Sequence, residues 1–206
     1  MVPDGLIHLI RHTQAEHNVN SDWSIRDPSL TPLGKQQAEL INESTLHNIQ
    51  TTANLLVASP LTRTLQTTLI GLPQLKARLD AAGQPLIVLS RLQEESDSPC
   101  DTGKSREVLE KTEEFEGIDF SALEDDWHGK AGDFAPENVI ARAKWVRRWL
   151  RARPEREIVV VSHGGFLQVI TDTHPLDIWE NGEIRSFTFV EEEDEDAALK
   201  RYHRIT

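Results

Sequence analysis

"LIHLIRH" (residues 6–12) and "EIVVVSHGG" (residues 157–165) are the two stretches that decide the fold. Both are short, apolar and rich in β-branched residues, and both end at polar residues or glycine. Such runs are typical of strands buried on both faces of a parallel sheet. "NLLVASP" (54–60) and "PLIVLSRLQEE" (85–95) have the same character, so we predict four parallel strands.

Helix-like segments separate these strands. "TPLGKQQAELINES" (31–44) begins with Thr31 as a candidate N-cap and Pro32 at the first helical position. "LTRTLQTTLIGL" (61–72) follows the second strand, and the amphipathic "PENVIARAKWVRRWLRARP" (136–154) ends before Pro154. Alternating strands and helices indicate right-handed crossovers and a sheet covered on both faces. We predict the α/β class: a three-layer α/β/α sandwich with a mostly parallel central sheet.

The length of 206 residues suits one domain with a substantial core, so we predict a single domain over 1–206. Residues 96–134 are rich in Asp, Ser, Gly and Glu and lack a strong period. We predict that they form a small inserted cap or substrate loop. Residues 191–206 begin with a run of acidic residues, which predicts a solvated C-terminal tail.

The net charge of −12 argues against nucleic acid and anionic membranes as partners, because both require a basic surface. No apolar run approaches the roughly 20 residues of a transmembrane helix. The first ten residues lack the features of a signal peptide, and Cys100 is the only cysteine. We therefore expect a cytoplasmic protein. The sequence carries no signal for an oligomeric state.

Charged and imidazole side chains follow each predicted strand. Since ligands bind outside the carboxyl ends of parallel strands, we expect these side chains to share one site. Two arginines and the helix N-termini nearby favour an anion with the geometry of a phosphate group. The residues at these strand ends are Arg11, His12, Arg63, Glu94, Glu95, His163, Gly164 and Gly165.

Each motif alone also has a purely structural interpretation. "SPLTRTLQT" could be an ordinary helix start, with Ser59 as the cap and Arg63 on a solvated face. The tryptophans, including Trp145 and Trp149 at helical spacing, fit a core better than a ligand cage. The common position of the motifs at successive strand ends favours one functional site.

Three histidines near the N-terminus raise the alternative of a metal site. His8 and His12 are four residues apart, and His17 follows. That spacing would place two imidazoles on one face only in a helix, whereas this segment is predicted as a strand. We therefore predict no metal and no other cofactor, with His8 packed within the strand.

Five motifs, in order, resemble the histidine phosphatase (phosphoglycerate mutase-like) superfamily, especially its fungal cytosolic members. They are "LIRHTQAEHN", "DPSLTPLGKQQA", "VASPLTRTLQT", "RLQEESDSPCDTG" and "VVVSHGGF", and the resemblance spans about residues 5–190. The ordered set is far more specific than any single motif. The resemblance implies an enzyme that needs no metal.

The resemblance also implies roles for individual residues. His12 matches the nucleophilic histidine, and Arg11 and Arg63 match the phosphate-binding arginines. Asn18 matches a polar residue that contacts the phosphate, and His163 matches the second phosphate-pocket histidine. Gly164, in the same "SHGG" motif, is expected to contact the substrate as well.

The proton donor is expected among the acidic residues after the third strand. Glu94 lies where the general acid of the family usually falls, and Glu95 is the alternative. Asp101 is the next candidate if neither serves.

The expected function is hydrolysis of a phosphomonoester, a small metabolite or a phosphoprotein, through a phosphohistidine in which His163 is protonated. The chain departs from the family at Thr13, where glycine is common and lets the backbone pass close to the phosphate. This departure leaves two alternatives open: a mutase or repurposed isomerase or dehydratase on the same fold, and a non-catalytic domain that binds a phosphorylated ligand.

Overall fold

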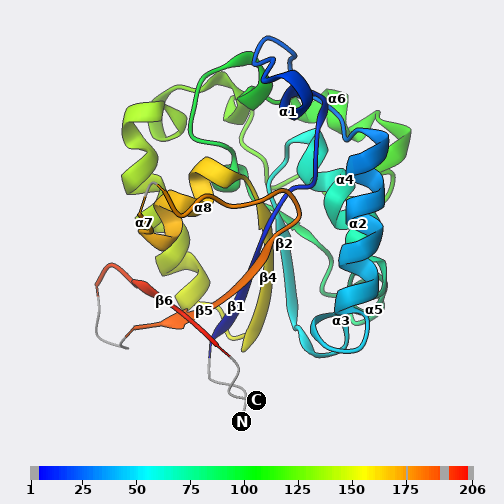
Figure 1. The fold of residues 1–206 in the computed structure, drawn as a ribbon, viewed down its shortest axis with the longest axis vertical. Coiled ribbons are helices and arrows are strands. Elements are labelled where there is room, and N and C mark those ends of the chain that lie inside the picture. Colours follow the sequence, from blue (N-terminus) through cyan, green and yellow to red (C-terminus); the bar gives the residue numbers. More distant parts are fainter. Residues whose placement is uncertain (1–4, 175, 191–194, 204–206) are drawn as a thin grey trace.

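A mixed sheet of six strands forms the centre of the protein in a computed structural model, which describes residues 5–174, 176–190 and 195–203 (Figure 1). The strand order is β3-β2-β4-β1-β5-β6. The strands are β1 (Leu6–Arg11), β2 (Leu55–Ala58), β3 (Ile87–Val88), β4 (Glu157–Ser162), β5 (Ile184–Phe189) and β6 (Leu199–Arg201).

The predicted parallel strands are present, in the order β3, β2, β4, β1. The third is much shorter than the run that predicted it, because the chain turns into a 3-10 helix at Ser90–Leu92. Two strands were not predicted. β5 pairs antiparallel with β1, and β6 pairs antiparallel with β5.

The C-terminal segment therefore differs in part from the predicted solvated tail. Leu199–Arg201 form the edge strand β6, and Ala197 is fully buried. The acidic run at 191–194 and residues 204–206 lie outside the described residues. The three residues "LKR" are too few to predict a strand from the sequence, and the acidic residues before them favoured a solvated tail instead.

Helices cover both faces of the sheet, which confirms the predicted α/β/α sandwich (Figure 1). One apolar cluster holds residues of α2, α4 and α5, and a second holds residues of α7 and α8. The helices are α1 (Glu16–Asn20), α2 (Pro32–Thr45), α3 (Ile49–Thr52), α4 (Thr62–Gly71), α5 (Pro73–Ala81), α6 (Arg106–Glu110), α7 (Val139–Arg151) and α8 (Gly164–Thr171). No helix within these described ranges is both long and apolar enough to cross a bilayer.

The helix starts show where local sequence signals were sufficient. Thr31 caps α2, as predicted, and its side chain accepts a hydrogen bond from the backbone N–H of Gly34 at 2.9 Å. α4 begins differently: its N-cap is Leu61 rather than Ser59. The carboxylate of Asp27, from a distant loop, accepts from the backbone N–H of Thr62 at 2.9 Å. Such a long-range cap cannot be identified from the sequence of the helix.

The prediction that the tryptophans belong to the core is confirmed for the buried Trp127 and Trp179 and was wrong for Trp145, which is 39% exposed. Trp149 is partly buried and packs against the core, and its ring stacks on that of Trp145. The guanidinium of Arg91 lies 4.6 Å from the Trp145 ring centre, and that of Arg153 lies 5.2 Å from the Trp149 ring centre. Helical spacing placed the two rings side by side, but it could not say which face of the helix is buried.

The register of the two central strands places the site. Arg11, the last residue of β1, is opposite Ser162, the last residue of β4. The backbone N–H of His12 then donates to the carbonyl of Ser162 at 2.9 Å. The residues that follow both strands therefore leave the same edge of the sheet together, as the sequence predicted.

Residues 96–134 cross this end of the sheet as short helical turns and loops, including α6 (Figure 1). Trp127 anchors them, since its buried ring packs against Gly103. A Cβ at Gly103 would lie 2.1 Å from that ring.

Gly34 provides a test of how α2 supports the loop after β1. A Cβ at this position would lie 1.9 Å from the carbonyl oxygen of Gln14, so Gly34→Ala must push the helix and the loop apart. We expect a loss of about 1–3 kcal/mol in the free energy of unfolding, measured by urea denaturation. Gly129→Ala is the matched control, because a Cβ there meets nothing within 4 Å. Equal stability of the two variants would contradict this packing.

Candidate active site

His12 and Arg63 form the floor of the site. The His12 ring is fully buried, and its Nδ1 lies 2.7 Å from the carbonyl oxygen of Thr13. A carbonyl can only accept, so Nδ1 carries the proton and Nε2 carries the electron pair. The Nε–H of Arg63 donates to this Nε2 at 3.2 Å. Burial, and then the charges of Arg63 and Arg11, hold the pKa of His12 well below its usual value.

His163 lies beside His12 at the end of β4. The two ring centres are 5.3 Å apart. The Nε2 of His163 is 2.8 Å from the hydroxyl of Ser59, while its Nδ1 is buried and has no hydrogen-bond partner among the described residues. Burial and the neighbouring charge of Arg63 lower the pKa of His163 far below its usual value. The lowered pKa favours a neutral ring in the free site, while the expectation of a protonated His163 concerns the site with phosphate bound and stays a prediction.

Arg11 lines the cavity from the end of β1. One of its terminal nitrogens donates to the backbone carbonyl of Trp179, and its Nε is buried without a partner in the described part of the chain. Gly164 makes room for it, because a Cβ there would lie 3.1 Å from that Nε. The glycine is therefore needed for the position of the guanidinium.

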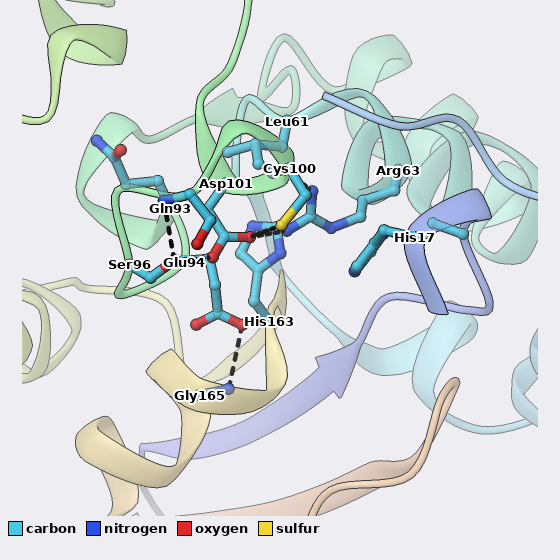
Figure 2. Close-up of polar contacts among 12 residues, drawn as sticks. His17, Leu61, Arg63, Gln93, Glu94, Ser96, Cys100, Asp101, His163 and Gly165 are labelled. Carbon is cyan, nitrogen blue, oxygen red and sulfur yellow. Dashed lines mark hydrogen bonds and ion pairs between the residues drawn. The ribbon is translucent and has the colours of Figure 1, made fainter. Parts of the chain in front are cut away.

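Glu94 lies over the N-terminus of α8 (Figure 2), and the Glu95 carboxylate also lies against Gly165. The Glu94 carboxylate accepts from the backbone N–H groups of Gly165, Phe166 and Glu95 at 3.1, 2.7 and 2.9 Å. Desolvation, followed by the charge of Asp101, raises the pKa of Glu94 in spite of these bonds. A raised pKa is what a proton donor needs near neutral pH.

Asp101 is a central feature that the sequence indicated only weakly. Its carboxylate forms a 2.9 Å ion pair with Nη2 of Arg63, while the adjacent carbonyl of Cys100 accepts from Nη1 at 2.6 Å. Every nitrogen of the Arg63 guanidinium is thus occupied by the protein in the free site. The fully buried Arg63 also rules out the structural interpretation in which it lies on a solvated helix face.

His17 and Trp23 are further cavity residues without an assigned role in the sequence. His17 has a pKa lowered to about 4 by burial and by Arg63, so it is neutral at neutral pH. Its Nε2 contacts the amide of Asn18 at 3.0 Å, and its Nδ1 is buried without a partner within the described ranges. The only sequence signal was that His17 precedes Asn18. Asn18 itself lines the cavity, and its side-chain oxygen accepts from the backbone N–H of Ala15 at 3.0 Å.

Figure 2 shows how Arg63, His17 and His163 converge on the same space as Glu94 and Asp101. The cavity has a volume of about 390 Å³. Several buried nitrogens around it have no partner among the residues that the structure describes: Arg11 Nε, His17 Nδ1, His163 Nδ1 and Trp179 Nε1. Buried donors without acceptors are costly, so their gathering at one place indicates an anion with several oxygens as the ligand.

One histidine and the cysteine outside this set have other surroundings. His8 contacts Ser186 at 2.8 Å and Glu157 at 3.0 Å, which agrees with the prediction of a histidine packed within the strand. Cys100 is buried, and desolvation raises the pKa of its thiol to about 12. A thiol in that state is a poor nucleophile.

Thr13, which stands where glycine is common in the family, directs its side chain toward Thr67 and Gly182. Its hydroxyl and its backbone N–H both lie against the hydroxyl of Thr67, at 3.2 and 3.1 Å. Its methyl group packs toward Gly182, where a Cβ would lie 3.2 Å away. Thr67 donates to the carbonyl of Arg63 at 2.7 Å, so Thr13 connects the loop after β1 to the helix turn that carries Arg63.

The fold and the site define an α/β protein whose cavity is lined by buried, unpartnered nitrogens, and sequence comparison gives its family. The sequence model of the histidine phosphatase superfamily (branch 1) matches residues 7–201. A phosphoglycerate mutase-like protein of Arabidopsis thaliana is 33% identical over 196 residues, which cover 78% of this chain and 71% of the relative. The chain belongs to the histidine phosphatase superfamily.

Solved structures show the same fold at low sequence identity. A mycobacterial glucosyl-3-phosphoglycerate phosphatase superimposes with a TM-score of 0.58 at 18% identity, covering 95% of this chain and 96% of the other. A phosphoserine phosphatase from Entamoeba histolytica gives 0.56 at 17% identity, covering 96% and 95% of the two chains. At these identities the likeness concerns the fold alone.

The Arg63–Asp101 pair generates a prediction about anion binding. Asp101→Asn removes a negative charge from the cavity and weakens the hold on Arg63, so orthophosphate should bind about tenfold more tightly, measured by calorimetry. Asp97→Asn, at an exposed neighbouring position, should leave the affinity unchanged. Weaker phosphate binding by a correctly folded Asp101→Asn variant would show that Asp101 supports the site rather than competing with its ligand.

Proposed function

We propose that this protein is a metal-independent phosphomonoesterase that works through a phosphohistidine on His12. The observation that carries the proposal is the neutral, buried His12 ring, whose Nε2 electron pair is fixed by the bond from Nδ1 to Thr13. Unpartnered donors around the same cavity supply the binding site for the phosphate oxygens. The family and its phosphatase neighbours support the same class of reaction.

In the first step, Nε2 of His12 attacks phosphorus while the bond to the leaving oxygen breaks. The guanidinium groups of Arg11 and Arg63 stabilise the equatorial oxygens. Arg63 must release both Asp101 and Nε2 of His12 to do so, which frees the electron pair for the attack, and the incoming phosphate replaces the carboxylate. His163 donates through Nδ1–H while its Nε2 accepts from the hydroxyl of Ser59, so a neutral ring is sufficient.

Glu94 acts as the acid in the first step and as the base in the second. Its proton moves to the leaving oxygen in the first step, and the alcohol departs. In the second step the Glu94 carboxylate accepts a proton from water as that water attacks phosphorus. The P–N bond breaks, phosphate is released, and Glu94 is protonated again.

The products that form distinguish this proposal from the two alternatives, a mutase and a binding domain. A mutase would return the phosphoryl group to a second hydroxyl, giving a rearranged ester instead of free phosphate. A binding domain would form no phosphoenzyme. Free phosphate, rearranged ester and covalent label are therefore measured together.

The phosphoenzyme is the first test. Rapid quench with a labelled phosphate ester should trap a label that is stable in base and labile in acid, as a P–N bond is. His12→Ala should abolish the label, and Arg63→Ala should slow its formation by about a hundredfold or more. Excess EDTA should leave the rate within about twofold, because side chains supply every group that the mechanism uses. A label on serine or cysteine, or an active His12→Ala variant, would exclude the mechanism.

The role of Glu94 is tested by the leaving group and by pH. Glu94→Gln should slow hydrolysis of an alkyl phosphate by about 10²–10⁴-fold and that of p-nitrophenyl phosphate much less, since nitrophenolate hardly needs a proton. Because the pKa of Glu94 is raised, the protonated acid persists to higher pH than in an ordinary carboxyl group. Activity on alkyl phosphates should therefore fall as the pH rises through that raised pKa.

Glu95→Gln, at the neighbouring cavity carboxylate, is the matched control for Glu94→Gln. It should keep the normal difference between the two leaving groups. An equal loss on both substrates in Glu94→Gln, with a selective loss in Glu95→Gln, would assign the acid to Glu95.

A further inference from the structure

We propose that the physiological substrate is a phosphate ester whose alcohol carries hydrogen-bond donors, an ammonium group included, and no carboxylate. The inference rests on the proposed function and concerns the part of the cavity beyond the phosphate. Its basis is the charge of that part of the cavity and the orientation of the cations around it.

The outer lining of the cavity is negative and neutral. Glu95, Ser96, Ser98 and Gln168 line it beside the phosphate-binding groups. Glu95 is only partly buried, and no cation in the described part of the chain lies within ion-pair distance of its carboxylate. Ser96 donates to the carboxylate of Asp101 at 2.6 Å, and its oxygen accepts from the backbone N–H of Ser98 at 3.1 Å. The Glu95 carboxylate is therefore the main acceptor that this part of the cavity offers to a ligand.

The cations near the cavity are committed elsewhere. Lys130 donates to the backbone carbonyl of Glu94 at 2.9 Å, and Arg142 donates to the same carbonyl at 3.2 Å. Lys104 lies against Asp27 at 3.5 Å and donates to the Thr62 hydroxyl at 2.8 Å. None of the three lines the cavity. Arg11 is the single Lys or Arg side chain among the described lining residues, and it is assigned to the phosphate.

The mouth of the cavity adds an apolar surface. The Trp23 side chain lines the cavity while 53% exposed, and Ile178 lines it while 62% exposed. The Trp23 ring lies 5.7 Å from the ring of His17, so it stands next to the phosphate-binding groups. The face of an indole ring attracts an ammonium group and packs against carbon–hydrogen groups, whereas it offers nothing to a carboxylate.

A substrate carboxylate would therefore meet Glu95 and the indole face without a cation to receive it. A hydroxyl or ammonium group at the same place would donate to Glu95. The cavity thus selects against acidic phosphate esters by repulsion, in addition to any attraction for donor-bearing ones.

Two substrate pairs that differ at a single group test the inference. Phosphoethanolamine and phosphoserine differ by one carboxylate, and glycerol 3-phosphate and 3-phosphoglycerate differ by a hydroxymethyl group in place of a carboxylate. We expect the member without the carboxylate to have a kcat/KM at least about tenfold higher in both pairs. The same order should hold for Kd, measured by calorimetry on His12→Ala, which keeps both arginines but cannot accept the phosphoryl group.

Glu95→Gln should reduce the preference several-fold by improving the carboxylate-bearing member, while Glu39→Gln, on an exposed position of α2, should keep it. An equal or reversed preference in the wild-type protein, in kcat/KM or in Kd, would overturn the inference. So would an unchanged preference in Glu95→Gln. Hydrolysis of p-nitrophenyl phosphate reports separately on the proposed function: if it is absent, the function fails while the calorimetric comparison still decides the ligand class.

Discussion

The buried guanidinium of Arg63 is the constraint on which the rest of the site depends. A cation without solvent contact is costly unless hydrogen bonds and opposite charge surround it. The chain meets this cost with the carboxylate of Asp101 and the carbonyl of Cys100, both from the segment that follows the third strand. Arg63 therefore holds that segment against the sheet end, and the carboxylate occupies the place that an anionic ligand needs. In the free site, the Asp101 carboxylate binds Arg63 in the way that we propose for a phosphate oxygen of the ligand.

The same charge determines the protonation of the histidines. Burial and Arg63 lower the pKa values of His12, His17 and His163 together. A histidine with a lowered pKa is neutral at every pH above that value, so all three rings are neutral across the neutral range. This serves a nucleophile directly, because only the neutral ring has an electron pair on Nε2. In the free site, the positive charge around the cavity therefore comes from the arginines.

The sequence predicted the fold class and the convergence of the strand-end residues because both follow from local patterns. Apolar runs marked β1 and β4, and the rule that parallel strands share a carboxyl edge placed His12 beside His163. Long-range contacts could not be predicted in this way. The ion pair of Arg63 with Asp101 joins residues 38 positions apart. In β5, buried and partly buried residues roughly alternate, and the turn residues just before the strand obscured this pattern in the sequence. The orientation of Thr13 was not predictable for the same reason, since its side chain and backbone N–H contact Thr67 on another element.

The surroundings of Glu94 favour its ionised form and its protonated form at the same time. Two backbone N–H groups at the start of α8 and the N–H of Glu95 bind its carboxylate and favour the ionised form, while desolvation and Asp101 favour the protonated form that an acid needs. The proposed cycle uses both in turn. The arriving phosphate displaces Asp101 but brings more negative charge, so the proton stays on Glu94 until the leaving oxygen takes it. Once the alcohol departs, the N–H groups stabilise the new carboxylate, which is then the base that the attacking water requires. A helix N-terminus beneath a desolvated carboxylate thus provides the acid and the base of the two steps from one side chain.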